Sequence, residues 1–125
     1  MTATEVVLRD EMGLRVPSVS KIAVANGAQV TFKAADGADS ALYFSPATAA
    51  ILSPKPGARV DLEADKSVIY TFSTSGPGVY GVIAEAPEDP APTRFDFGSP
   101  SNPPVLVIRS GKGTDYPVPS NPPGS

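Results

Sequence analysis

The sequences SVIYTFS at residues 67–73 and VYGVIA at residues 79–84 decide the fold class of this chain. Both runs are rich in β-branched and aromatic residues, which fit the half-buried surface of a pleated sheet. Between them, SGPG at residues 75–78 has the composition of a tight turn. These runs therefore predict a pair of β-strands at the centre of the hydrophobic core.

Shorter apolar runs surround this pair, separated by turn residues at intervals of roughly eight to twelve positions. Asn26-Gly27 is the strongest of the turn signals, and alternation places Ile22, Val24, Val30 and Phe32 toward the core. The spacing predicts an all-β sandwich of about seven to eight strands. The runs read as strands are residues 5–9, 14–16, 21–24, 29–33, 41–44, 58–63, 94–97 and 105–108.

One short helix is expected near residues 46–52. Ser45 is a candidate N-cap, Pro46 suits the first helical position, and helix-forming residues follow until Pro54. Helical periodicity is almost absent from the rest of the sequence, so the helix is an insertion in a β-protein.

The domain organisation follows from length and from the position of the prolines. A chain of 125 residues is expected to form one compact core. Ten of its 15 prolines lie from Pro87 onward, and they favour extended chain without regular ladder bonds. We therefore predict a sandwich over residues 1–110 and a Pro/Gly-rich tail over residues 111–125. We expect no membrane insertion and find no secretory signal pattern at the N-terminus.

The composition excludes several classes of chemistry. The sequence contains no His, no Cys and no Trp, which removes disulfides, thiolate nucleophiles and imidazole catalysis. A net charge of -3 disfavours binding to a phosphate backbone, which requires clustered Lys and Arg. We therefore expect neither an enzyme nor a nucleic-acid-binding protein.

Three segments in order resemble the cupredoxin-like family. Residues 22–32 follow an I-x-V-x-x-G-x-x-V-x-F pattern, which in that family turns the chain across the core. Pro56-Gly57 precedes Val60 and Leu62, and residues 78–84 are similar to the family's G-x-Y-x-Y-x-C strand. The resemblance implies a Greek-key, cupredoxin-like sandwich.

The copper ligands of that family are missing from the matching positions. Ser40 stands where the first His would fall, and Ala84 stands at the Cys position. A type 1 copper site needs a thiolate and imidazoles, so no copper cofactor is expected. The resemblance implies a non-catalytic, copper-free module of a periplasmic or extracellular protein. Such a module would give structural support or bind a protein or glycan partner.

Acidic residues supply an alternative function. Glu85, Glu88 and Asp89 form a cluster whose oxygens suit a hard cation, and Asp36 with Asp39 forms a second one. Both groups also fit solvated loops and turns, because Asp and Gly are selected by tight connections. A sandwich that binds a hard cation or a carbohydrate through acidic loops therefore remains the alternative.

Two further patterns resemble catalytic or nucleotide-binding motifs without their context. Ser18 and Lys21 match S-x-x-K, but this motif works on a helix in a much larger domain. Residues 110–114 contain a Gly-Lys-Gly segment, yet Pro117 prevents the helix that a phosphate loop requires. Asp61 and Glu63 are explained by strand alternation as solvent-facing residues. We therefore assign no catalytic residue.

Overall fold

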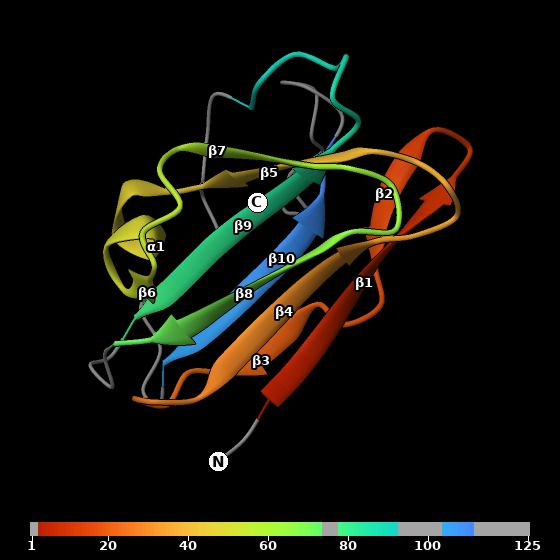
Figure 1. Ribbon diagram of the computed structural model, residues 1–125. Coiled ribbons are helices and arrows are strands. Elements are labelled where there is room, and N and C mark those ends of the chain that lie inside the picture. Colours follow the sequence, from red (N-terminus) through yellow and green to blue (C-terminus); the bar gives the residue numbers. More distant parts are fainter. Residues whose placement is uncertain (1–2, 74–77, 93–103, 112–125) are drawn as a thin grey trace, which may run out of the picture.

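The computed structural model describes residues 3–73, 78–92 and 104–111, which form two five-stranded β-sheets packed face to face (Figure 1). This confirms the predicted all-β sandwich. The described residues contain ten strands against the predicted seven to eight, and the sequence gives no signal for the two-residue strand β6 (Leu52–Ser53).

The first sheet has the strand order β2-β1-β4-β8-β6. Its longest strand, β1 (Ala3–Glu11), forms an antiparallel hairpin with β2 (Leu14–Pro17) and pairs in parallel with β4 (Gln29–Ala34). On the far side of β4 lies β8 (Ser67–Phe72), and β6 pairs with its end.

The second sheet has the order β3-β10-β9-β5-β7. Its central strand, β9 (Val79–Glu85), pairs antiparallel with β5 (Ser40–Phe44) and parallel with β10 (Val105–Ser110). The edge strands are β3 (Lys21–Ala23) and β7 (Arg59–Leu62).

One predicted strand pairing is wrong. The runs at 67–73 and 79–84 form β8 and β9, which belong to different sheets and do not pair with each other. Asn26-Gly27 separates β3 from β4, which lie in different sheets, so the chain crosses between the sheets at this turn. Hydrophobic alternation identifies a strand and its buried face, but it does not identify the strand beside it.

The core lies between the sheets and is centred on three aromatic rings. Phe32, Phe44 and Tyr70 pack edge to face, with ring centroids 5.7–6.3 Å apart. Ile22, Val24 and Val30 are also buried, as predicted. Each fully buried side chain of this size stabilises the fold by about 1.5–3 kcal/mol.

The predicted helix is present as α1 (Pro46–Ala50), with Pro46 in its first turn. Ser45 is the N-cap, and its Oγ accepts a hydrogen bond from the Thr48 N–H at 3.2 Å. The buried Thr48 hydroxyl donates to the carbonyl of Gly81 at 3.0 Å, which fastens the helix to β9.

Other expectations lie partly beyond the described ranges. The predicted strand at 94–97 falls outside the described ranges, as do residues 112–125 of the predicted tail. Within the described part of the chain, no helix is long and apolar enough to cross a membrane.

Candidate functional site

Three turns that are distant in sequence meet at one end of the sandwich (Figure 1). The Asp10 N–H donates to Asp36 Oδ2 at 3.1 Å, which joins the β1–β2 turn to the β4–β5 turn. The Ala64 N–H donates to Asp39 Oδ1 at 2.8 Å, which joins the β4–β5 turn to the β7–β8 turn. The carbonyl of Ala34 also accepts from the Asp65 N–H at 2.9 Å. Strands β9 and β10 end at this side as well.

This end carries a strong excess of negative charge. Residues 10–13, 35–39, 63–66 and 85–89 contain nine of the chain's 13 acidic residues and a single basic residue, Lys66. We call these four segments the acidic end. Apart from Glu85, its carboxylates are exposed or partly exposed. The acidic residues are Asp10, Glu11, Asp36, Asp39, Glu63, Asp65, Glu85, Glu88 and Asp89.

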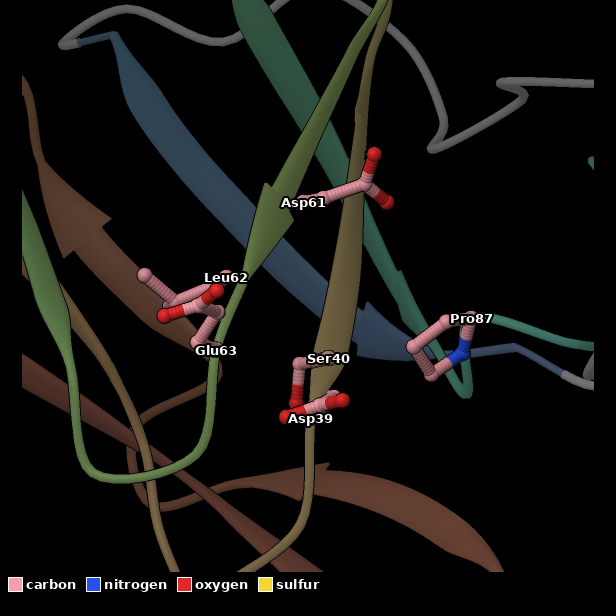
Figure 2. Close-up of a pocket in the computed structure, with 6 residues that line it drawn as sticks. All are labelled: Asp39, Ser40, Asp61, Leu62, Glu63 and Pro87. Carbon is pink, nitrogen blue, oxygen red and sulfur yellow. The ribbon is translucent and has the colours of Figure 1, made fainter.

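A pocket of about 200 Å³ opens between the acidic end and the outer side of β7 (Figure 2). Three carboxylates contribute to its wall, and in Figure 2 the Asp61 side chain extends away from Leu62. The lining residues are Asp39, Ser40, Asp61, Leu62, Glu63 and Pro87.

One of these carboxylates is already paired with a cation. Asp61 Oδ1 lies 2.7 Å from Arg59 Nη2, and this hydrogen-bonded carboxylate raises the pKa of the Arg59 guanidinium above its ordinary value. Arg59 also donates to Tyr43 Oη at 2.6 Å and to the carbonyl of Pro87 at 3.3 Å. Arg59 therefore links the segment after β9 to β5 and β7.

The sequence-predicted cluster of Glu85, Glu88 and Asp89 is divided in the structure. Glu85 is fully buried, and its Oε2 would lie 2.5 Å from a Cβ placed on Gly111. Glu88 is exposed and Asp89 is half-buried in the turn that follows. Across the described ranges, no three His, Cys, Asp or Glu side chains are placed to hold a metal ion.

Asp36 and Asp39 instead join the turns. Each accepts a backbone N–H from another turn, as described above, and Asp36 has a φ of 60°. Their placement agrees with the interpretation that these residues were selected by turn geometry. Asp39 also lines the pocket, so it takes part in both structure and site.

Ser40 and Ala84, the two positions that the sequence resemblance aligns with copper ligands, lie near the same end. Ser40 begins β5 and Ala84 is near the end of β9, and both are fully buried. Ser40 Oγ has no hydrogen-bond partner among the described residues. Neither side chain provides a thiolate or an imidazole, so these positions hold no soft-metal ligand.

Arg15 contacts two turns of the acidic end, and the sequence analysis did not single it out. Although it is only 7% exposed, its Nε donates to the carbonyl of Asp39 at 2.7 Å. Its Nη1 donates to Asp10 Oδ1 at 3.1 Å and to the carbonyl of Gly13 at 3.3 Å. The sequence offered one signal of this role: Arg15 lies between the apolar residues Leu14 and Val16 in a short predicted strand.

The other candidate residues have structural roles or lie outside the described ranges. Ser18 Oγ accepts from the Val7 N–H at 2.9 Å, and Lys21 is exposed at the start of β3. Asp61 and Glu63 are exposed, in agreement with alternation. Residues 112–114 of the Gly-Lys-Gly segment fall beyond the part that is described.

Comparisons with family models, with curated proteins and with solved structures found no match to this chain. The fold and the site therefore define its class from the residues alone. It is a β-sandwich domain with an acidic end that consists of three interlinked turns and residues 85–89.

Proposed function

We propose that this chain is a non-catalytic, copper-free module with a Greek-key, cupredoxin-like sandwich, and that it binds a positively charged partner through its acidic end. In this proposal the module belongs to an exported, periplasmic or extracellular protein. The observation that carries the proposed function is the concentration of exposed carboxylates on three interlinked turns.

The scaffold part of the proposal is supported by the sequence resemblance and by the two-sheet β-sandwich. The residues that carry the resemblance occupy β3, β4, β7 and β9. Ser40 and Ala84 stand at the positions that the resemblance aligns with copper ligands, and neither supplies the thiolate or imidazole that a type 1 copper site needs. In this proposal the chain has the sandwich scaffold without the copper site, and its loops serve a different role.

The binding part is supported by electrostatics. Carboxylates on one end of a small domain add their potentials, which attract a cationic surface and speed its association. Exposed charges of this kind are screened by salt over a Debye length of about 10 Å at 0.1 M ionic strength. Binding that uses the acidic end must therefore weaken as ionic strength rises.

The direct test uses deca-lysine labelled with a fluorophore, and fluorescence anisotropy as the readout. We expect saturable binding at about 20 mM salt that weakens at least tenfold at about 200 mM salt, because screening reduces the attraction. A triple variant, E11Q/E63Q/E88Q, removes three exposed carboxylates whose side chains make no hydrogen bond among the described contacts. We expect this variant to bind roughly tenfold more weakly, a loss of about 1.4 kcal/mol.

Glu5→Gln is the control, because Glu5 is exposed near the start of β1, away from the acidic end. Its affinity for deca-lysine should stay within about twofold of the unchanged chain, since rim charges distant from a contact contribute little. Absence of saturable binding at low salt would refute the proposed function. Equal affinities for the triple variant and the unchanged chain would also refute it.

The pocket favours one competing function, the binding of a hard cation by Asp39, Asp61 and Glu63. Equilibrium dialysis against calcium and copper, followed by thermal melts, separates the two functions. A cation that binds only the folded state raises the melting temperature. The proposed function predicts no stoichiometric binding of either ion. Calcium binding that is lost in Glu63→Gln would replace it with the cation site.

A further inference from the structure

The tip of the β1–β2 hairpin presents an apolar side chain to solvent. Met12 is 100% exposed, and it is one of two large hydrophobic residues that are exposed in the described part of the chain. Its backbone has a φ of 55°, and Gly13 follows with a φ of 86°. Two successive positive φ values are typical of a type I′ turn, in which Asn, Asp or Gly normally occupies the first position.

Met12 has neither of the properties that suit a residue to this position. It lacks the flexibility of Gly, and it has no short polar side chain to bond with the local backbone. It also buries no surface that would offset the unfavourable conformation. Strained backbone retained without a gain in packing is a reason to look for a function.

The hairpin that carries Met12 is held rigidly. Arg15 bonds to Asp10 and to the carbonyl of Gly13, and Asp10 Oδ1 also accepts from the Gly13 N–H at 3.2 Å. Asp36 fixes the N–H of Asp10 from the neighbouring turn. A side chain on a preorganised turn loses less conformational entropy when it binds than one on a flexible loop.

The surroundings of Met12 indicate the chemistry of its partner. Glu11 precedes it directly and is exposed, and Asp36 is exposed on the adjacent turn. The apolar tip therefore lies within the negative potential of the acidic end. A surface complementary to it has an apolar socket bordered by Lys or Arg.

Ile69, the other exposed large hydrophobic residue, lacks these features. It is 52% exposed in β8 and lies opposite Thr31 of β4, on the outer face of the first sheet. A single apolar residue on a mixed polar face is normal for a soluble domain. Ile69 therefore provides a matched control for Met12.

We propose that the hairpin tip at residues 10–13 docks into another protein, and that Met12 inserts into an apolar socket ringed by basic side chains. This inference rests on the proposed function of the acidic end and adds a specific anchor to it. The carboxylates bring the basic partner close, and Met12 adds apolar burial when the two surfaces meet. Methionine suits this role because its flexible, polarisable side chain adapts to irregular sockets.

The test compares two ten-residue peptides, deca-lysine and a peptide with two central leucines between two runs of four lysines. We expect the leucines to raise the affinity of the unchanged chain roughly tenfold, because they bury apolar surface against Met12. Met12→Ser should lose this gain and still bind deca-lysine. Met12→Leu should keep the gain, since it preserves the apolar tip.

Ile69→Ser should keep both the binding of deca-lysine and the gain from the leucines. The inference is overturned if the gain survives in Met12→Ser, or if Ile69→Ser removes it to the same extent. Failure of the unchanged chain to bind deca-lysine would instead refute the proposed function. Thermal unfolding of each variant confirms that the hairpin substitution leaves the fold intact.

Discussion

The two ends of the sandwich are stabilised by different means. At the acidic end, turns are joined by Asp carboxylates and by the buried guanidinium of Arg15. At the opposite end, which includes α1 and residues 24–28 and 51–58, the helix is fastened by the neutral hydroxyls of Ser45 and Thr48. Lys55 is the one charged residue in these three segments. We call this second region the neutral end.

The ends also differ in backbone conformation. Among the described residues, Met12, Asp36 and Asp65 have positive φ values without being glycine, and all three lie at the acidic end. The neutral end uses Gly27 and Gly57 where its backbone takes positive φ. Like charges and positive φ values at non-glycine residues therefore coincide at the acidic end, and the proposed function draws on both features.

The largest effect is expected from Arg15→Ala at the acidic end. This change removes three hydrogen bonds and leaves the carbonyls of Gly13 and Asp39 without their donor. Loss of a buried charged donor should cost about 2–4 kcal/mol. Urea denaturation measures the free energy of unfolding directly. A loss below about 1 kcal/mol would show that the turns hold together without Arg15.

A smaller loss is expected from Ser45→Ala at the neutral end. The substitution removes the N-cap of α1, together with the contact between the Ser45 and Thr48 hydroxyls. Loss of an N-cap typically costs about 1 kcal/mol, so this variant should be more stable than Arg15→Ala. Urea denaturation of both variants under the same conditions shows at which end the substitution lowers the free energy of unfolding more. The reverse order of stabilities would contradict the comparison.

High pH should lower the free energy of unfolding through Tyr70, which lies in the half of the core beside the neutral end. Burial raises the pKa of Tyr70, whose ring packs against Phe44 at the end of β5. Above about pH 10 the unfolded chain releases the phenol proton while the folded chain retains it, so stability falls as pH rises. Tyr70→Phe should remove this contribution. Urea midpoints between about pH 9 and 11 measure it, and parallel slopes for both chains would disprove it.

The smallest effect has the opposite sign. Met12→Asn should stabilise the fold by about 0.5–1 kcal/mol, because Asn tolerates positive φ better than Met. The same variant should lose the affinity gained from the leucine-containing peptide. A thermal melt and the anisotropy assay on one sample test both outcomes. A destabilised Met12→Asn would mean that the Met12 backbone is not strained.

The sequence predicted the strands and the core well because both depend on local alternation. Phe32, Val30 and Ile22 face the core as expected, and the Ser45 cap with Pro46 located the helix. The sequence did not predict which strands pair. Strands β8 and β9 are adjacent in sequence, yet they lie in separate sheets. Pairing depends on contacts between residues far apart in the chain, and alternation does not encode them.

The candidate site was likewise predicted only in part from the sequence. The sequence identified Asp36, Asp39, Glu85 and Glu88 as acidic residues of interest, and strand alternation explained Glu63 as solvent-facing. Only the fold shows that the turns at residues 36–39 and 63–66 touch and that Glu85 is buried. The exposure of Met12 on a strained turn could not be read from its neighbours, because Asp10-Glu11-Met12-Gly13 predicts a turn but not its type.

The position of β10 affects how the chain reaches its native state. In the second sheet this late strand lies between β3 and β9, and it is the strand to which β3 is hydrogen-bonded among the described residues. Until residues 105–110 leave the ribosome, β3 lacks this partner strand, and the edge of β9 that pairs with β10 stays open. Contacts between strands so far apart in sequence slow folding, and the second sheet is completed only after residues 105–110 have been synthesised.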